Sequence, residues 1–238
     1  MITVATWNVL HRVHAENWGE DVAKQWPDEA ERIAAVTALL AARTEQVIAL
    51  QEVSGDLLAS LRRALPGRTV HAFRYPRVPK PRRGPVSLNE LAEYLVLLVD
   101  GPSREIGAEA FEQDLGKGAL AVEVAGTLVV ATHVSVDRRR TRELARLAEL
   151  AATPPGQAAV LLGDFNTDRA TVEAALGNGF SVVPLPPNSL PTRADSSGSA
   201  SQWIDHVVVR GARAENAAVE SAQGLSDHNL VRATVIDH

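Results

Sequence analysis

Polar side chains that could take part in catalysis follow directly after apolar runs at four points of the sequence. The phrases are Thr-Trp-Asn8, Leu-Gln-Glu52, Ala-Thr-His133 and Gly-Asp164-Phe-Asn166. Each run is typical of a buried strand, and strand ends in layered α/β folds converge on a crevice. We therefore expect these side chains to meet, because carboxylates and amides bind hard cations and histidines hold or move protons.

Two further phrases lie near the end of the chain, Trp-Ile-Asp205-His-Val and Ser-Asp227-His228. An ionised carboxylate at Asp205, among apolar neighbours, needs a partner that offsets its desolvation, and a histidine is a natural one. Taken singly, each candidate has an ordinary structural explanation, such as a turn, a helix cap or a hydrogen-bonded core histidine. The whole set is harder to explain in this way, because all the ordinary explanations would have to hold together.

Composition limits the chemistry and the partners. The 238 residues are 45% hydrophobic and can bury a substantial core, so we expect one domain over residues 1–238. The net charge of −5 argues against a broad basic surface for long nucleic acids but leaves a small phosphate ester possible. The chain has no cysteine, so any metal must be held by carboxylate, amide or imidazole groups.

The first ten residues lack a basic segment followed by an apolar stretch, and no apolar run approaches the length of a membrane span. We therefore expect a soluble, cytoplasmic protein without a membrane partner.

The elements that must position the candidate residues are visible as apolar patterns. Strands are predicted at residues 2–7, 47–50, 94–99, 119–124, 128–132, 159–162, 203–209 and 230–236. Helices are predicted at residues 28–43, 55–65, 144–151 (before Pro154-Pro155) and 168–177. A hairpin at 122–128 and the clustered late strands exclude a wholly parallel sheet. We expect a two-sheet core with helices outside, and long loops at 75–87 and 184–201.

In their order, the phrases T-W-N-V-L, L-Q-E-V, T-H-V, G-D-F-N, W-I-D-H-V and S-D-H resemble those of a known superfamily. It is the endonuclease/exonuclease/phosphatase superfamily, which includes deoxyribonuclease I-like and abasic-site nucleases, deadenylases and inositol-phosphate phosphatases. The matching phrases span residues 2 to 232. The resemblance implies a four-layer α/β sandwich, with two mixed β-sheets packed face to face and helices on the outside, and a Mg²⁺ or Mn²⁺ cofactor.

The resemblance also implies a role for each matching residue around the metal and the attacking water. Glu52 resembles the principal metal carboxylate, with Asn8 and Asp227 near the metal, either directly or through water. Asp164 resembles the residue that orients or deprotonates the attacking water, and Asn166 the amide that holds this water or a phosphate oxygen.

The two histidines are expected at the phosphate. By resemblance, His228 bonds a non-bridging phosphoryl oxygen, and Asp205 fixes its tautomer and stabilises its cationic form. His133 contacts the scissile phosphate or assists the leaving group. An alternative assignment makes His228 the general base in place of Asp164, and the sequence leaves both open.

Substrate contacts cannot be carried over in the same way. Many members have a glycine-containing strand that leads to a Ser-Arg pair, where this chain has Y-L-V-L-L-V-D at residues 94–100. A cluster of arginines soon after His133 could instead hold a phosphate or carboxylate group, although a solvated helix start is the ordinary alternative. These predicted substrate-binding residues are Arg138, Arg139, Arg140 and Arg142. A second basic segment lies at 74–83. With only 4% aromatic residues an extended base-stacking platform is not expected, but a single ring could stack one base, the candidates being Trp7, Trp18, Trp26 and Tyr75.

Three functions are compatible with this reasoning. The first is a metal-dependent phosphodiesterase or nuclease that acts on nucleic-acid ends or nucleotides by in-line attack of water. The second is a phosphomonoesterase for a small phosphorylated metabolite, such as a nucleotide, a sugar or a natural-product intermediate. The remote third is an inactive binding module, which would have no need of the full set of candidate catalytic residues.

Overall fold

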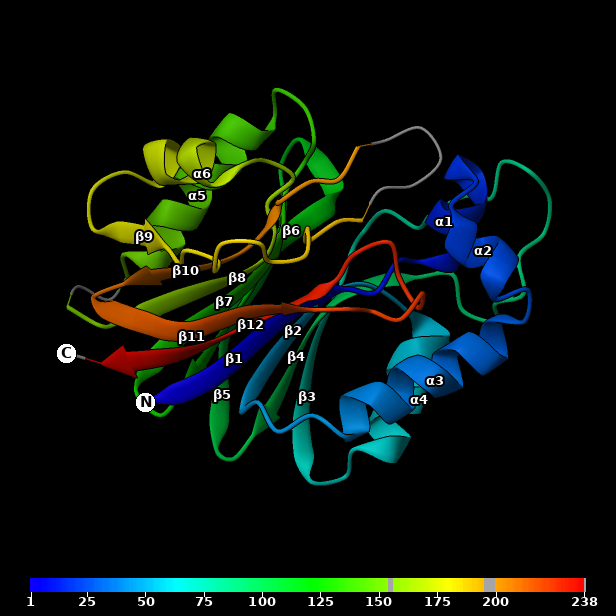
Figure 1. Ribbon diagram of the computed structural model, residues 1–238, viewed down its shortest axis with the longest axis horizontal. Coiled ribbons are helices and arrows are strands. Elements are labelled where there is room, and N and C mark those ends of the chain that lie inside the picture. The colour runs from blue at the N-terminus through cyan, green and yellow to red at the C-terminus, as the bar shows by residue number, and fades with distance from the viewer. Residues whose placement is uncertain (154–155, 195–199, 238) are drawn as a thin grey trace.

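Two mixed β-sheets form the centre of the computed structural model, which describes residues 1–153, 156–194 and 200–237 (Figure 1). One sheet has the order β11-β12-β1-β2-β4-β3, with bounds Ala212–Glu220, Leu230–Asp237, Ile2–Asn8, Val47–Ser54, Glu93–Asp100 and Arg68–Arg74. The other has the order β5-β6-β7-β8-β10-β9, with bounds Ser103–Phe111, Asp114–Val124, Thr127–His133, Ala159–Asp164, Asp205–Arg210 and Phe180–Val182. One pair in each sheet is parallel, β1 with β2 and β7 with β8, and the others are antiparallel.

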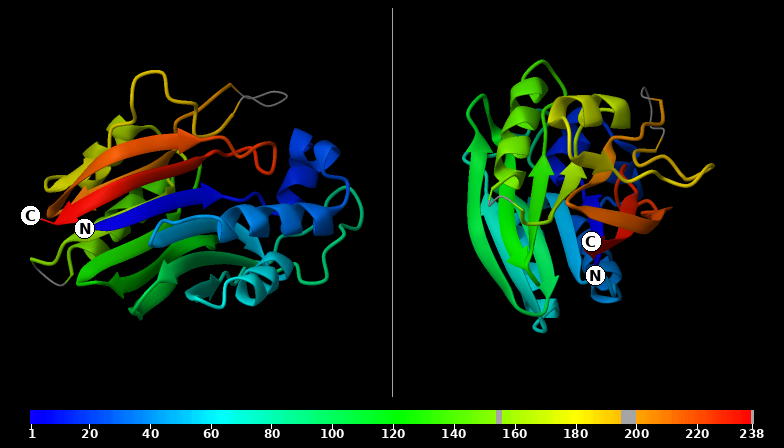
Figure 2. Two further views of the ribbon diagram at one scale, coloured as in Figure 1. Left: turned by 60° about the horizontal axis from the view of Figure 1, so that its bottom comes forward. Right: turned by 90° about the vertical axis from the view of Figure 1, so that its left-hand side faces the viewer.

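The alternation of side chains along each strand separates the apolar residues into layers. In β1, Val4 packs between the two sheets, whereas Trp7 packs against helices α3 (Glu29–Ala41) and α4 (Gly55–Ala64). On the other sheet, Leu161 packs against α5 (Arg140–Ala151) and α6 (Arg169–Leu176). In Figure 1, α5 and α6 lie above the sheets and α3 and α4 below them, and the left view of Figure 2 shows α3 and α4 in front of the sheets. The expected four-layer α/β sandwich is confirmed.

Local signals set the starts of three helices. Asp28, Ser54 and Asp168 cap α3, α4 and α6, each accepting a hydrogen bond from a backbone N–H of the first turn. Two short helices that the sequence did not predict, α1 (Arg12–Trp18) and α2 (Asp21–Gln25), follow β1. None of the described helices combines the length and apolar character needed to cross a membrane.

All eight predicted strands are present, but β2 extends beyond its predicted end at residue 50 to Ser54, and β6 begins at Asp114 instead of residue 119. The strand predicted from residue 203 begins at Asp205, and β3, β5, β9 and β11 were not predicted. The loop predicted at 75–87 is found between β3 and β4. Residues 154–155, the two prolines that follow a predicted helix, and residues 195–199, which belong to the second predicted loop, lie outside the described residues.

A buried arginine fastens two of the segments that carry candidate residues. Arg32 in α3 is 3% exposed and donates hydrogen bonds of 2.8 Å to the carbonyl oxygens of Val9, Leu10 and Leu225. Its charge is balanced by Glu29, whose Oε1 lies 2.6 Å from its Nη2. The segment after β1 is therefore tied to the segment before β12, at the end of the sandwich opposite the two termini (Figure 1).

Candidate active site

Three candidate side chains stand at the carboxyl ends of strands from both sheets. Asn8, His133 and Asp164 are the last residues of β1, β7 and β8. Gly163 precedes Asp164 where β7 and β8 approach closely, because a Cβ atom at this position would lie 2.1 Å from the carbonyl oxygen of Thr132. The two parallel strand pairs thus direct their ends to one place, as the sequence predicted.

Glu52 reaches the same place from inside a strand. It lies at a register shift in β2, between Leu50 and Val53, and its φ is +58°. Asn166, beyond the end of β8, also has a positive φ of 52°. Such left-handed conformations cost a non-glycine residue on the order of 1 kcal/mol or more and concentrate at functional sites. The bulge turns the carboxylate of Glu52 out of the strand pattern and towards Asn8.

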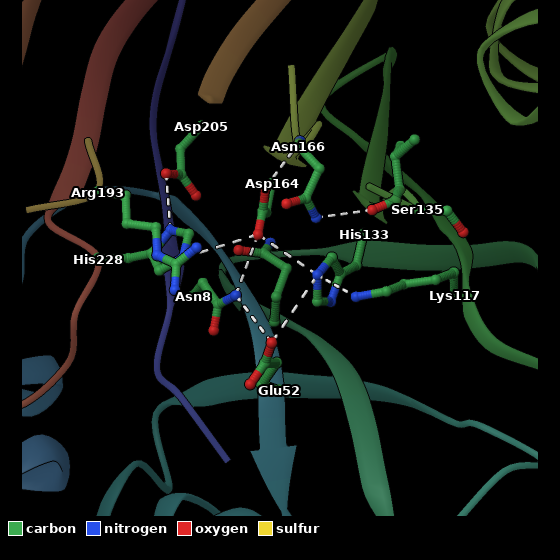
Figure 3. A network of polar contacts seen from close by, with 12 residues as sticks. Asn8, Glu52, Lys117, His133, Ser135, Asp164, Asn166, Arg193, Asp205 and His228 are labelled. Atoms are coloured by element: carbon green, nitrogen blue, oxygen red, sulfur yellow. Dashed lines mark hydrogen bonds and ion pairs between the residues drawn. The ribbon is translucent and has the colours of Figure 1, made fainter. Parts of the chain in front are cut away.

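Asp164 is at the centre of the group (Figure 3). Its Oδ2 lies 3.2 Å from Nδ2 of Asn8, 3.4 Å from Nε2 of His133 and 3.9 Å from Nε2 of His228. Its Oδ1 accepts a 2.9 Å hydrogen bond from the backbone N–H of Asn166. Burial alone would raise the pKa of Asp164, but His133 and His228 outweigh it and hold the pKa below its ordinary value. The carboxylate is therefore ionised at neutral pH.

Glu52 is a buried carboxylate, 6% exposed, next to Asp164. Its Oε1 accepts a 3.2 Å hydrogen bond from Nδ2 of Asn8, and its Oε2 a 3.0 Å bond from the backbone N–H of His11. Burial raises its pKa, but the positive charges of neighbouring histidines and Lys117 outweigh this and lower it. Within the described residues, no lysine or arginine forms an ion pair with Glu52, so a buried negative charge remains available to a cation.

His228 is hydrogen-bonded to Asp205, with Nδ1 and Oδ2 2.8 Å apart. Burial alone disfavours the imidazolium, but the carboxylates of Asp205 and Asp227 outweigh it and raise the pKa of His228 to about 10. Burial raises the pKa of Asp205 to about 6. Between these two values the pair is ionised, with a cationic His228. Nε1 of Trp7, in β1, donates a 2.9 Å hydrogen bond to the carbonyl oxygen of His228 and so fixes the backbone of His228.

Two cations that the sequence analysis did not single out also reach the site. Lys117, in β6, contacts Nε2 of His133 through its Nζ. Arg193 donates from Nε to Oδ2 of Asp227 at 2.9 Å, and its Nη2 lies 3.2 Å from Oε1 of Glu20. Figure 3 shows both cationic side chains directed at the group around Asp164, from opposite sides. The site therefore contains positive charge on both sides of its two central carboxylates.

These residues line a cavity of about 330 Å³. The predicted residues on its wall are Asn8, Glu52, His133, Asp164, Asn166, Asp227 and His228. Asp205 lies behind His228 and is fully buried. The wall also includes Leu10, Trp18, Glu20, Lys117, Val136 and Arg193. The structure thus brings together the predicted catalytic and metal-binding residues.

The four predicted substrate-binding arginines do not line this cavity. Arg139 is bound to Asp137 and Asp114, and Arg140 donates a 2.7 Å hydrogen bond to the carbonyl oxygen of Asn166. Arg139 and Arg142 line a separate cavity of about 560 Å³ between the end of β5 and α5. Substrate binding by this cluster stays a prediction, while Arg140 supports the loop that carries Asn166.

Two sets of side chains could hold a metal ion. Asp164, Asp205 and His228 present ligand atoms within 4.8 Å of one another. However, a cationic His228 has no lone pair for a metal and repels it. These three residues therefore fit the Asp205–His228 ion pair better than a metal site. Glu52 and Asp164 instead lie on either side of the Asn8 amide, which donates a hydrogen bond to each, and the lowered pKa of each carboxyl group leaves both ionised. Their hard oxygen atoms fit Mg²⁺ or Mn²⁺.

A family model matches most of the chain. The model of the endonuclease/exonuclease/phosphatase family matches residues 5–228. The chain belongs to this family. Members of the family are hydrolases that act on phosphoesters and generally depend on a divalent metal. Membership therefore makes this chain a phosphoesterase or nuclease and does not specify its substrate. Among curated proteins, no sequence matches the chain.

Solved structures of family members have the same fold. The protein from Bacteroides vulgatus, described as an endonuclease/exonuclease/phosphatase, is 15% identical with a TM-score of 0.71, over 100% of this chain and 99% of that one. The TDP2 of D. rerio complexed with a single strand DNA product is 14% identical with a TM-score of 0.69, over 98% of both chains. The mannosyl-6-phosphatase of Bacteroides thetaiotaomicron VPI-5482 is 15% identical with a TM-score of 0.68, over 99% of this chain and 100% of that one. At these identities the likeness shows the fold and leaves the substrate undetermined.

Proposed function

We propose that this chain is a divalent-metal-dependent phosphodiesterase or nuclease that acts on nucleic-acid ends or nucleotides. The observation that carries the proposal is the position of Asp164, an ionised carboxylate within 4 Å of the amide of Asn8 and of two histidine rings. Phosphoryl transfer needs an oriented nucleophile and positive charge around the phosphoryl oxygens. This arrangement offers both within one cavity.

The metal site is assigned to Glu52, with Asp164 and Asn8 beside it. The buried charge of Glu52 supports this assignment, because among the described residues it has no lysine or arginine partner and only a 3.9 Å contact between Oε1 and Nε2 of His133. In the structure the Asn8 amide donates its NH₂ group to both carboxylates, while its oxygen accepts from the N–H of Leu10. Asn8 thus spaces the two carboxylates. Asp227 is bound to Arg193 and would reach the metal through water. The bound cation would supply positive charge against the phosphoryl and leaving oxygens.

The protein's own side chains account for the remaining steps. Asp164 accepts a proton from the attacking water, and Asn166 holds this water or a phosphate oxygen. The cationic His228 donates its Nε2–H to a non-bridging phosphoryl oxygen, because its Nδ1 is already bound to Asp205. His133 and Lys117 stand on the other side of Asp164, where they can stabilise the leaving oxygen.

A phosphomonoesterase for a small metabolite is the second candidate. The cavity volume of about 330 Å³ and the net charge of −5 support it, since both suit a small substrate. The similar fold of a mannosyl-6-phosphatase is compatible with this activity as well.

Hydrolysis assays decide between these functions. The purified protein is incubated with Mg²⁺ or Mn²⁺ and with bis-p-nitrophenyl phosphate, p-nitrophenyl phosphate, a short oligonucleotide and nucleotides with 2′- or 3′-phosphates. We expect cleavage of the diester and the oligonucleotide, loss of activity with a chelator and recovery with added metal. Release of phosphate from monoesters alone would establish the second candidate, and metal-independent turnover would contradict the metal site.

Glu52→Gln is expected to weaken activation by the metal. The substitution keeps the size of the side chain and removes the negative charge, so half-maximal activity should need at least roughly 10- to 100-fold more Mg²⁺, the range found when even an outer partner of a metal ligand is lost. A metal titration of the hydrolysis rate measures this shift. Glu20→Gln is the matched control, because Glu20 lines the same cavity but is bound to Arg193. Equal metal requirements in Glu52→Gln and the wild type would remove Glu52 from the metal site.

A further inference from the structure

An exposed tryptophan stands at the rim of the candidate active site. Trp18, the last residue of α1, is 57% exposed and lines the same cavity as Glu52 and Asp164. An exposed indole at the edge of a cavity can stack on a ring of a bound ligand, because burying its large apolar face is favourable.

The ring of Trp18 is held in place from beneath. It stacks on His14, with ring centroids 5.0 Å apart and planes inclined by 12°. Nε2 of His14 is in turn 3.0 Å from Oε2 of Glu93, a carboxylate that is only 1% exposed. A buried anchor therefore fixes the plane of the indole, which reduces the entropy lost when a second ring stacks on its other face.

A basic loop is attached to the same helix. Asn17, next to Trp18, donates from Nδ2 to the carbonyl oxygen of Lys80 at 3.0 Å and accepts from the N–H of Arg82 at 2.7 Å. Nη1 of Arg83 lies 3.1 Å from the place that a Cβ atom would take at Gly19. The loop between β3 and β4 passes beside α1 and α2 in Figure 1.

Three cations of this loop have no ion-pair partner among the described residues, whereas a fourth, Arg77, is paired with Asp114. Lys80, Arg82 and Arg83 are exposed and, among the described residues, form no ion pair, unlike Arg139 and Arg146. In a chain with a net charge of −5, an unpaired basic group next to an exposed aromatic ring indicates an anionic, ring-bearing ligand. A single-stranded nucleic acid has both features, because bases alternate with phosphates along the strand.

We propose that Trp18 stacks on a base next to the scissile phosphate of a single-stranded nucleic-acid end, and that Lys80, Arg82 and Arg83 bind the adjoining phosphates. This subsite rests on the proposed phosphoester hydrolysis and adds the substrate class to it. The ligand is an oligonucleotide end of a few nucleotides, and the subsite makes no distinction between DNA and RNA.

Binding of a labelled hexanucleotide tests the subsite. Fluorescence anisotropy is measured with Mg²⁺ in the Asp164→Asn background, and electrophoresis checks that the strand is uncut. Adding Trp18→Ala is expected to weaken binding roughly 5- to 150-fold, the range found for loss of one base–aromatic stack, while Trp18→Phe should retain most of the affinity. Trp203→Ala is the matched control, since Trp203 is 48% exposed and does not line the cavity.

A strand of the same length without bases separates stacking from charge. Trp18→Ala should not change its binding, whereas Arg82→Ser with Arg83→Ser should weaken both strands and reduce the slope of log Kd against log salt by roughly 0.7 per lost phosphate contact. The exposed pair Arg62→Ser with Arg63→Ser, in α4, controls for net charge. DNA and RNA hexanucleotides are both used, and similar affinities for them are expected.

The possible failures are distinguishable. Unchanged affinity in Trp18→Ala, or an equal loss in Trp203→Ala, would overturn the subsite even if the wild type hydrolyses phosphoesters. Binding that depends on Trp18 in a protein without any hydrolytic activity would support the subsite and overturn the proposed function.

Discussion

Asp164→Asn is expected to lower kcat by about 10²- to 10⁴-fold at saturating metal, the usual contribution of a positioned general acid or base. The carboxylate is ionised at neutral pH because His133 and His228 lower its pKa despite its burial. Asparagine has nearly the same shape but cannot accept the proton of the attacking water. Initial rates against bis-p-nitrophenyl phosphate, with thermal unfolding of the same preparation, measure the loss in a folded protein.

Asp168→Asn provides the matched control for this substitution. Asp168 follows Asp164 by four residues, is exposed and caps α6 by accepting from the N–H of Thr171 at 3.0 Å. Asparagine caps helices about as well as aspartate, so both the fold and kcat should be unchanged. If Asp164→Asn retained more than about a tenth of the wild-type kcat, Asp164 would have no part in activating water.

The position of the site could be predicted because its residues stand at the ends of apolar runs. Asn8, His133 and Asp164 are at strand ends in the structure, as the phrases around them indicated. Glu52 was expected beyond its strand and instead lies within β2, where burial continues from Val47 to Ser54. A positive φ at a glutamate has no local sequence signal, because it is imposed by the bulge and by neighbouring strands.

Lys117 was missed although a signal for it existed. The predicted hairpin turns at Ala125-Gly126, and counting back along its two strands pairs Gly118 with His133. Lys117 is therefore adjacent to the pair that contains His133, a conclusion that needs only the register of the hairpin. Lys117 belongs to no sequence motif, so only the register of the two strands places it beside His133.

Arg193 and the unpredicted strands had no comparable signal. Arg193 enters the site from a loop whose position depends on bridges to Gln202 and to His228. His228 is distant from Arg193 in the sequence, so no local pattern indicates this contact. β5 is an edge strand whose residues are mostly exposed, and its charged side chains protect the edge rather than mark a strand. β11 is also an edge strand, rich in alanine and charged residues, a composition that favours helices.

The charge on His228 distinguishes the two assignments of the general base. With Asp205 and Asp227 beside it, His228 has a pKa of about 10 and is a cation at neutral pH. A cation cannot accept a proton from water but can donate a hydrogen bond to a phosphoryl oxygen. If the cation is the active form, activity falls as the pH rises through this pKa. If the neutral ring is the active form, activity rises over the same interval.

Asp205→Asn is therefore expected to separate the assignments by the direction of its effect. Loss of the carboxylate that accepts from Nδ1 at 2.8 Å lowers the pKa of His228 from about 10 towards its ordinary value of 6.5. With a cationic His228 as the donor, the alkaline limb of the kcat profile moves to lower pH, and activity at about pH 8.5 is largely lost. A gain of activity at this pH would instead make His228 the base.

His228→Ala measures how much the His228 side chain contributes to kcat. Loss of one preformed donor to a developing negative charge costs about 10²- to 10³-fold in kcat, and we expect this loss at neutral pH, where the wild-type ring is charged. Because alanine does not titrate, the alkaline limb should also disappear from the profile of this variant. A limb that persists near the wild-type position would belong to another group, and Asp205 would then serve only to hold the ring. An alkaline limb that moves in Asp205→Asn and vanishes in His228→Ala assigns the catalytic charge to the Asp205–His228 pair and leaves Asp164 as the base.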